Sequence, residues 1–321
     1  MRILARHNRV RIGRLFGGSS AGMRVDNVHP WLGKKSDAVF ETYDPAASDA
    51  CDIVFIALPS GEAMRIVPEI LALGKKVIDL GGDFRLADPA IYHEYYGREH
   101  AAPEFLGKAV YGMPELNRER IAAASLIANP GCYPTSAILP LVPLLRRGII
   151  DPKNIIINSM SGASGAGRSS SVELSFCEVN ENARVYKVGT HQHIPEIGQA
   201  LQQATGQESA ITFTPHLIPI ARGIHTTICA PLMKNFGSDD IQNAFDEDYG
   251  NEPFVRAWRM NIPEIKNVGW TNDIAIGFRI DKKNGRVILL SAIDNLVKGA
   301  AGQAVQNMNL LFGIEETEGL Q

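Results

Sequence analysis

The stretch "CDIVFIALPSGEAMRIVPEILALGKKVIDLGG", residues 51–82, decides the fold of the N-terminal half of this chain. It begins with a continuous apolar run, which is typical of a strand buried on both faces. Apolar residues at helical spacing follow from Glu62 to Leu73, and Gly74 then provides a helix C-terminal cap. A second apolar run, "KKVIDLGGDF", predicts the next buried strand. A strand, a helix and a strand at this spacing predict a parallel, doubly wound sheet.

Two further strands are predicted on either side of this unit. One is "RVRIGRLFGG", residues 9–18, and the other is "ASLIANPG", residues 124–131. Together with residues 51–82 they predict an α/β fold with a doubly wound parallel, Rossmann-like sheet.

From about Asn154 the pattern changes to strands of mixed character, which predict a largely antiparallel second sheet. An Asn-Gly pair in "KKNGR", residues 282–286, predicts a hairpin, and residues 294–313 form an amphipathic helix that Gly313 caps. We therefore expect a second, mixed-sheet α+β domain over residues 132–295. The dinucleotide-binding domain is expected over residues 1–131 plus 296–321. The predicted strands of the second sheet are residues 154–162, 183–193, 210–220, 223–232, 274–280 and 286–293.

The composition narrows the function classes. With 321 residues, 45% apolar and 21% charged, the chain is long enough for two globular domains. A net charge of −3 leaves no electrostatic footprint for nucleic acid or membrane surfaces, and no run approaches the ~18 apolar residues of a membrane span. Four widely spaced cysteines without a C-x-x-C pair favour reduced thiols in a cytoplasmic protein, with neither disulfides nor a structural zinc site.

One of those cysteines, Cys132, lies in "ANPGCYPTSAILPL", residues 128–141, between a predicted strand and a predicted helix. Ligands of a doubly wound sheet collect at this kind of position. The positive end of the helix dipole favours the thiolate, so we expect a lowered pKa and a nucleophilic role. Cys51, Cys177 and Cys229 stand in apolar segments and are interpreted as buried structural residues.

The predicted helix after the cysteine has clear local determinants. Pro134 suits its first helical position, and Thr135 and Ser136 are expected to hydrogen-bond free amides there. Pro140 and Pro143 should bend it, because each removes an amide donor.

A nucleophilic cysteine usually needs a base, and "GTHQHIPEI" offers two histidines. His191 and His193 share one face if the stretch is a strand, and His193 is the chosen base. The pair has no third ligand at a metal-site spacing, so no metal is expected. A structural hydrogen-bonding role remains the alternative for one of the two.

Three further features predict anion or ligand binding. The Gly- and Ser-rich stretch "SMSGASGAGRSSS", residues 159–171, lets backbone amides approach an anionic or planar ligand, although surface loops share this composition. Arg85 and Arg222 lie just past buried strands, where an arginine can clamp a carboxylate or phosphate; a structural salt bridge is the alternative.

Taken in order, "NPGCYPT", "SGASGAGR", "HQHIPEI", "FTPHLIPIARGI" and "AIDNLVKGAAGQAVQNMN" resemble the N-acetyl-gamma-glutamyl-phosphate reductases of arginine biosynthesis. "GGDFRL" and "YGMPELNR" fit the same family, and the resemblance covers the chain from about Ile3 to Gly313.

The resemblance implies an NADPH-dependent reductase of the semialdehyde dehydrogenase type that acts on an acyl phosphate. Cys132 would displace phosphate to form a thioester, hydride would reduce it, and His193 would shuttle the proton. Asn295 matches a residue expected near the nicotinamide. The residues that the resemblance implies at the substrate are Arg85, His191 and Arg222.

The family normally opens with a strand and a G-x-x-G-x-x-G turn, and this chain has no such turn. "MRILARHN" looks like the second half of the helix that should follow it, so we expect an N-terminally incomplete Rossmann-like sheet. Purified as written, the chain should bind NADPH more weakly than a version extended upstream.

Where NAD-specific enzymes place an acid, "FGGSSAGMR" holds serines and an arginine, which favours NADP. The expected cofactor-binding residues are Ser19, Ser20, Arg24, Pro59, Ser60, Ser161, Gly162, Ser164, Gly165 and Asn295.

Alternative functions remain open from the sequence. One alternative is a related dehydrogenase that acts on aspartate or aminoadipate semialdehyde. The substrates differ in chain length, and binding contacts to one extra carbon discriminate by only ~1–3 kcal/mol, so the sequence does not separate these enzymes. A non-catalytic subunit that binds no cofactor is the other alternative; fast alkylation of Cys132 at neutral pH would argue against it. Large mixed sheets often pack face to face with a second copy of the chain, so we expect a homo-oligomer.

Overall fold

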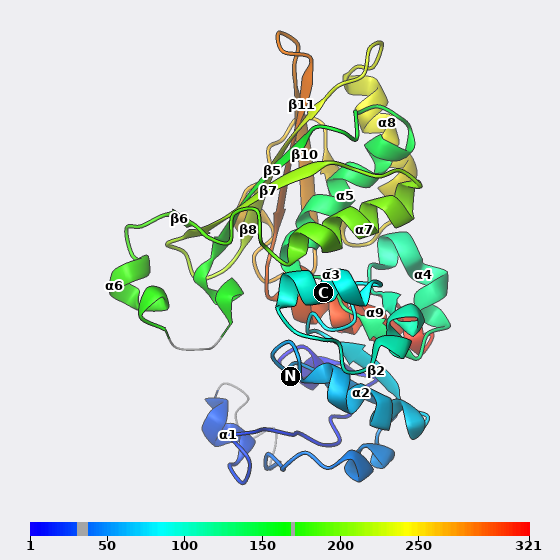
Figure 1. Ribbon diagram of the computed structural model, residues 1–321, viewed down its shortest axis with the longest axis vertical. Helices are drawn as coiled ribbons and strands as arrows, with labels where there is room; N and C mark the ends of the chain where they lie inside the picture. The colour runs from blue at the N-terminus through cyan, green and yellow to red at the C-terminus, as the bar shows by residue number, and fades with distance from the viewer. Residues whose placement is uncertain (31–37, 168–170) are drawn as a thin grey trace.

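The computed structural model describes residues 1–30, 38–167 and 171–321. Its strands form two sheets, one of four strands and one of seven. Figure 1 shows the seven-stranded sheet in the upper part of the molecule and the four-stranded sheet below it, with the C-terminal helix α9 beside the smaller sheet.

The four-stranded sheet is parallel throughout, as predicted. Its strands stand in the order β1-β2-β4-β3, and both pairs that involve β2 are parallel, as is the pair of β3 with β4. The out-of-sequence order requires crossover connections, which is the property of a doubly wound sheet. The strands are β1 (Ile53–Ile56), β2 (Lys76–Asp79), β3 (Val110–Tyr111) and β4 (Leu126–Ala128).

Helices cover both faces of this sheet. Val77 of β2 packs with α2 and α3, whereas its neighbour Ile78 packs with α4 and α9 on the opposite face. This explains why the strands are continuously apolar. The predicted helix ends at Ala72 with Leu73 as its C-cap, and Gly74 follows at φ +72°, as expected. The four helices are α2 (Ala63–Ala72), α3 (Pro89–Tyr96), α4 (Pro114–Ala122) and α9 (Gly302–Leu311).

The strand predicted over residues 9–18 is wrong. Within the described residues this segment makes a single isolated bridge, between Phe16 and Glu41. A strand requires a neighbour along its length, and β1 is the outermost strand of its sheet. The flanking elements are a short 3-10 helix, Leu4–Arg6, and α1 (Val25–Val28).

The seven-stranded sheet is mixed, in the order β6-β7-β5-β8-β11-β10-β9. The pairs β5–β7 and β9–β10 are parallel, and the other neighbours are antiparallel. The predicted hairpin is confirmed, because Asp281 of β10 pairs with Arg286 of β11. The strands are β5 (Ile155–Gly162), β6 (Arg184–Val185), β7 (Ile211–Ile218), β8 (Ile224–Pro231), β9 (Val255–Trp258), β10 (Ile274–Asp281) and β11 (Arg286–Ile293).

Three helices cover one face of this sheet and form the largest hydrophobic core with it. They are α5 (Cys132–Arg146), α7 (His193–Thr205) and α8 (Ser238–Tyr249). The strand predicted over residues 183–193 is mostly absent: only β6 is strand, and His193 opens α7. In Figure 1 the lobe with α6 (Phe176–Val179) projects away from the sheet.

Among the described residues, short 3-10 helices connect several of these elements. They span Pro45–Ala50, Pro103–Lys108, Ala163–Ala166, Val172–Leu174 and Ile265–Asn267. No helix among the described residues is long and apolar enough to cross a membrane.

Helix α5 continues through both of its prolines, because other elements replace the amide donors that the prolines lack. The carbonyl of Ser136, which Pro140 leaves without a helical donor, accepts from Ser291 Oγ at 2.6 Å. The carbonyl of Leu139, four residues before Pro143, accepts from Tyr249 Oη at 2.8 Å.

The expected start of this helix needs correction. The helix begins at Cys132 rather than at Pro134. Thr135 Oγ1 and Ser136 Oγ donate to the carbonyls of Gly131 and Tyr133, and do not cap free amides.

Candidate active site

Cys132, the candidate nucleophile, is the first residue of α5 and follows β4 and the turn at residues 129–131. It therefore stands at the carboxyl ends of the parallel strands, as predicted. A Cβ atom on the preceding residue, Gly131, would lie 2.5 Å from His193 Nε2 and 2.9 Å from Arg85 Nη1. Only glycine allows these two side chains to approach the turn so closely.

The two candidate histidines converge through a helix start and not through strand alternation. The backbone N–H of His193 donates to His191 Nδ1 at 3.0 Å, and the ring centroids are 4.6 Å apart. His193 Nε2 lies 3.4 Å from Arg85 Nη1, so this nitrogen faces a donor. Its buried Nδ1 has no hydrogen-bond partner in the described ranges. Within the described residues, neither ring nitrogen of His193 is hydrogen-bonded to the Cys132 thiol. Hydrogen bonds between catalytic groups often form only when the substrate is bound.

Arg85 is held by protein groups on three sides. Its Nε donates to the carbonyl of Asn129 at 2.9 Å, and its Nη2 donates to the carbonyl of Leu80 at 2.9 Å. Its Nη1 pairs with Glu196 Oε2 at 3.3 Å, and the side chain is only 9% exposed. The structural salt bridge considered for this arginine therefore exists, directly beside the candidate nucleophile.

Sequence reasoning missed Glu196, which the structure places at the centre of this cluster. Glu196 Oε1 accepts from the backbone N–H of Gly131 and from the hydroxyl of Tyr111, each at 2.8 Å. His193 Nε2 lies 3.9 Å from Glu196 Oε2. The quoted stretch "HQHIPEI" contained the signal, because residues three apart share one side of a helix.

The protonation state of the thiol differs from the one expected. Burial raises the pKa of the Cys132 thiol to about 11, although Arg85 and the backbone amide of Tyr133 act in the opposite direction. The expected low thiol pKa is therefore wrong for the protein without substrate. Burial lowers the pKa of His193 well below its ordinary value and that of His191 to about 4, so both rings are neutral at pH 7.

The other cysteines also differ from expectation. Cys177 is exposed, and Cys51 and Cys229 are half-buried. By exposure alone, Cys177 should therefore react first with an alkylating reagent, and a labelling experiment has to read Cys132 separately.

A π-helical segment, Val297–Ala301, precedes α9 and lies against the nucleophile. A Cβ atom on Gly299 would stand 2.8 Å from Cys132 Cβ. The neighbouring Lys298 is fully buried, with its Nζ 2.5 Å from Glu115 Oε1 and 2.8 Å from Gln306 Oε1. A buried ion pair thus anchors the segment that supports the thiol.

The structure brings together most of the candidate cofactor residues from the second sheet. Asn295 Nδ2 donates to Ser164 Oγ at 3.0 Å, and Asn295 Oδ1 accepts from the N–H of Gly223 at 2.7 Å. A Cβ on Gly165 would lie 2.7 Å from Ser161 Oγ, and one on Gly162 would lie 2.7 Å from the backbone nitrogen of Arg222.

The small residues of this loop serve packing within the protein. The N–H groups of residues 162, 163 and 164 donate to the carbonyls of residues 223, 220 and 221. These three amides are therefore already used, and any ligand contact here falls to side chains. Residues 168–170 of the predicted loop lie outside the described residues.

The remaining cofactor candidates lie in the smaller-sheet half. Ser19 and Ser20 stand in a turn before Arg24, whose guanidinium is paired twice with Asp26, at 2.7 and 2.9 Å. Pro59 and Ser60 follow β1, and the carbonyl of Ser60 accepts from Arg98 Nη1 at 2.8 Å.

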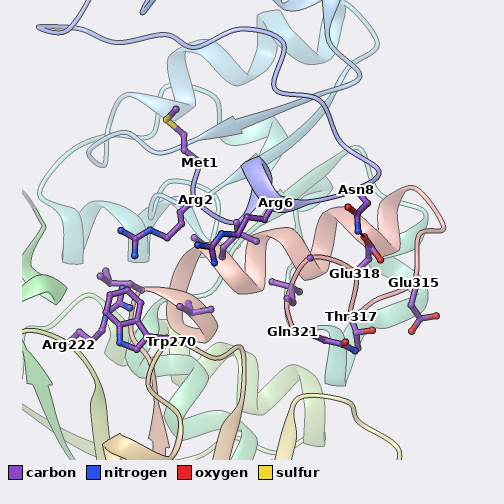
Figure 2. Close-up of a pocket in the computed structure, with 16 residues that line it drawn as sticks. Met1, Arg2, Arg6, Asn8, Arg222, Trp270, Glu315, Thr317, Glu318 and Gln321 are labelled. Atoms are coloured by element: carbon purple, nitrogen blue, oxygen red, sulfur yellow. Dashed lines mark hydrogen bonds between the residues drawn. The ribbon is translucent and has the colours of Figure 1, made fainter. Parts of the chain in front are cut away.

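A cavity of about 1000 Å³ lies beside the Asn295 loop, with Arg222, Leu296 and Val297 among its lining residues. Figure 2 shows Arg222 and Trp270 together at one end, with Arg2 and Arg6 nearby and acidic residues at the other end. The Arg222 guanidinium lies 3.5 Å from the centroid of the Trp270 ring. Its Nη1 is 3.2 Å from Asp294 Oδ2 but makes no directed hydrogen bond within the described ranges. Cys132 does not line this cavity.

A parallel sheet, a mixed sheet and a thiol at their junction are features of the semialdehyde dehydrogenase class. Residues 1–124 match the family described as semialdehyde dehydrogenase, NAD binding domain, which supports a nicotinamide cofactor. Residues 132–295 match the semialdehyde dehydrogenase dimerisation domain.

Full-length relatives narrow this class. A protein of Pelotomaculum thermopropionicum named N-acetyl-gamma-glutamyl-phosphate reductase is 48% identical over 322 residues, covering 100% of this chain and 93% of the relative. A protein of Desulfotalea psychrophila with the same name is 49% identical with the same coverage. The chain belongs to the N-acetyl-gamma-glutamyl-phosphate reductase family.

Solved structures agree on the fold. Aspartate semialdehyde dehydrogenase II from Vibrio cholerae superposes with a TM-score of 0.72 at 17% identity, covering 97% of this chain and 94% of that one. The Candida albicans aspartate semialdehyde dehydrogenase with NADP gives a TM-score of 0.72 at 16% identity, covering 97% and 93%. At this identity the likeness supports the fold alone.

Proposed function

We propose that this chain catalyses the NADPH-dependent reduction of N-acetyl-L-glutamyl 5-phosphate to N-acetyl-L-glutamate 5-semialdehyde and phosphate. The observation that carries the proposal is the turn at Gly131, which sets the Cys132 thiol at the start of a helix beside His193 and Arg85. The full-length relatives named for this reaction support the substrate.

In the first step, the Cys132 thiol transfers its proton to the neutral His193 ring as the sulfur attacks the acyl carbon. Burial keeps both the thiol and the ring neutral before the substrate binds, so the proton transfer has to accompany the attack. The bond between the acyl carbon and the phosphate oxygen then breaks, and phosphate leaves from a thioester. Arg85 is the cation nearest this turn, and we assign it and His191 to the substrate's anionic groups.

A nicotinamide cofactor, when bound, would supply the hydride and its two electrons that the thioester needs. The resulting thiohemiacetal on Cys132 collapses by cleavage of the carbon–sulfur bond, which leaves the aldehyde. His193, as the group next to the turn, is placed to deliver a proton to the sulfur as the carbon–sulfur bond breaks. The amides of Cys132 and Tyr133 at the helix N-terminus stabilise negative charge on the sulfur during the cycle.

For the cofactor we propose NADP. The fit rests on Arg222, whose Nη1 lacks a directed hydrogen bond and which lines the cavity beside Asn295. A guanidinium in that state suits a phosphate or carboxylate oxygen, so Arg222 can serve the cofactor or the substrate. The 2′-phosphate of the cofactor would be bound by hydrogen-bond donors of Ser19, Ser20 and Arg24. This requires Arg24 to break its ion pair with Asp26. The side chains of Ser161, Ser164 and Asn295, with Gly162 and Gly165, would border the nicotinamide, and Pro59 and Ser60 the rest of the dinucleotide.

We further propose that the protein works in the cytoplasm as a homo-oligomer, with a second copy on the face of the seven-stranded sheet opposite α5, α7 and α8. The exposed side chains of β5 alternate with buried ones and include Ile156 and Met160, at 36% and 37% exposure. The matched dimerisation domain spans this sheet. Light scattering should show an oligomer that Met160→Glu weakens and that Asn154→Asp, just outside β5, leaves intact.

The activity is tested in the reverse direction. With phosphate and NADP, N-acetyl-glutamate semialdehyde should give NADPH, and Cys132→Ser should abolish the reaction. Aspartate semialdehyde and NAD are the matched alternatives. Turnover of aspartate semialdehyde alone would refute the substrate, and equal use of NAD would refute the cofactor.

A further inference from the structure

We propose that Glu196 is a positioning residue that fixes the nucleophile turn, Arg85 and His193 relative to one another through a single buried carboxylate. The proposal rests on the proposed function for its kinetic part only. Neither the sequence motifs nor the relatives' names assign a role to this residue.

The carboxylate joins four separate parts of the fold. Glu196 belongs to α7, Tyr111 to β3, Gly131 to the turn after β4, and Arg85 to the segment after β2. Oε1 accepts both the Gly131 amide and the Tyr111 hydroxyl at 2.8 Å, and Oε2 accepts from Arg85 Nη1 at 3.3 Å. With three donors on two oxygens, the carboxylate defines one arrangement of these groups.

The two carboxylate oxygens of Glu196 contact different groups. Oε1 holds the backbone N–H that directly precedes Cys132, and so fixes where α5 begins. Oε2 faces the two cationic or basic groups, with Arg85 Nη1 at 3.3 Å and His193 Nε2 at 3.9 Å. Glutamine at this position can keep the Oε1 contacts but turns an amide N–H₂ group toward Arg85.

Burial makes these contacts consequential. Glu196 is 1% exposed and Arg85 is 9% exposed, so neither group can exchange its partner for water. Removing one charge from a buried pair leaves the other uncompensated, at a cost far above that of a surface pair. The Glu196 carboxylate therefore compensates the Arg85 charge beside the thiol, whereas the carbonyls of Asn129 and Leu80 also hold the guanidinium in place.

The negative charge of Glu196 also affects the pKa of the Cys132 thiol. The charged and titratable groups around Cys132 are Arg85 and Glu196, the His193 ring at Gly131, and the hydroxyls of Tyr133 and Tyr186. Glu196 raises the pKa of the thiol and Arg85 lowers it. Neutralising Glu196 alone should therefore lower the pKa of the Cys132 thiol.

This gives a test in which a structural and a positioning role differ. In Glu196→Gln, the pH midpoint for iodoacetamide labelling of Cys132 should move down by about one pH unit. At the same time kcat should fall about tenfold or more, because the nucleophile, base and arginine no longer share one anchor. Labelling is read by mass spectrometry of the Cys132 peptide, so that the exposed Cys177 does not interfere. Glu208→Gln, an exposed glutamate beyond the end of α7, should change neither quantity.

If Glu196 merely held the fold, its loss would instead make the half-buried Cys51, Cys132 and Cys229 label together with no separate shift at Cys132, and that result overturns the proposal. An unchanged labelling midpoint with unchanged kcat overturns it as well. Tyr111→Phe is the second variant, for use if Glu196→Gln does not fold. It keeps the carboxylate charge and removes one Oε1 contact, so the midpoint should stay and kcat should fall about threefold; unchanged kcat counts against the proposal. Labelling needs no turnover, so a failure of the proposed reaction is distinguishable from a failure at Glu196.

Discussion

Replacing Lys298 by methionine should destabilise this protein far more than the same replacement at Lys266. Both lysines make an ion pair at 2.5 Å, the first with Glu115 and the second with Glu264. The pairs differ in burial: both members of the first are 0% exposed, whereas those of the second are 76% and 57% exposed. Burial, and not distance, should decide the size of the effect.

The magnitude follows from the group that is left behind. Lys298→Met leaves the Glu115 carboxylate in the protein interior, where its Oε2 has no hydrogen-bond partner within the described ranges. Breaking a buried pair in this way costs about 3–5 kcal/mol. Lys298 Nζ also donates to Gln306, which adds to the loss. An exposed pair such as Lys266–Glu264 contributes about 0–1 kcal/mol.

The assay is thermal unfolding together with urea unfolding of both variants and of Glu115→Gln/Lys298→Met. We expect a fall in melting temperature of roughly 5–15 °C for Lys298→Met and of about 2 °C or less for Lys266→Met. The double variant removes both charges and should recover at least half of the loss in free energy of unfolding.

Similar losses for the two single variants would refute this reasoning. So would a double variant no more stable than Lys298→Met, because the loss could then not come from an unpaired carboxylate. Activity provides a further readout, since Lys298 adjoins Gly299 at the nucleophile.

Three other predictions concern helix packing and pH. Gly299→Ala should reduce kcat about tenfold or more, because the new Cβ would clash with Cys132. Gly198→Ala inside α7 is the matched control: its Cβ meets no described atom within 4 Å, and the change should stabilise the folded protein by about 0.5–1 kcal/mol. Tyr249→Phe should lower the free energy of unfolding in urea by about 1–3 kcal/mol, because the buried carbonyl of Leu139 loses the hydroxyl that replaces its helical donor. Tyr95→Phe, at a half-buried position, should change it little. The folded pKa of His191, about 4, lies below the unfolded value of ~6.5, so its contribution is present above pH 6.5 and is lost as pH falls towards 4. Between pH 7.5 and 5, wild-type protein should therefore lose about 2 kcal/mol more than His191→Gln, and equal losses would contradict this assignment.

The sequence predicted the elements whose signal is local. The apolar run at residues 51–58 and the helix before Gly74 could be recognised because burial on both faces and a glycine cap leave direct patterns. The strand predicted over residues 9–18 failed for the opposite reason: its apolar pattern is suitable, but a strand exists only where a neighbour pairs with it.

The candidate site shows the same division. Cys132 and His193 were recognised by residue type and by their neighbours in the chain, and both lie at the turn. Glu196 was missed because its partners Tyr111 and Arg85 are 85 and 111 residues away. The thiol pKa was predicted in the wrong direction because the helix dipole is a local property and burial is not.

The two prolines of α5 have a consequence for the order of folding. A helix whose carbonyls accept from Ser291 of β11 and Tyr249 of α8 cannot complete its hydrogen bonding alone. Its last stabilising contacts arrive only when segments more than a hundred residues later in the chain have docked. We expect the helix that presents Cys132 to gain full protection from hydrogen exchange late in folding, so that the reactive end of the molecule matures together with the sheet behind it.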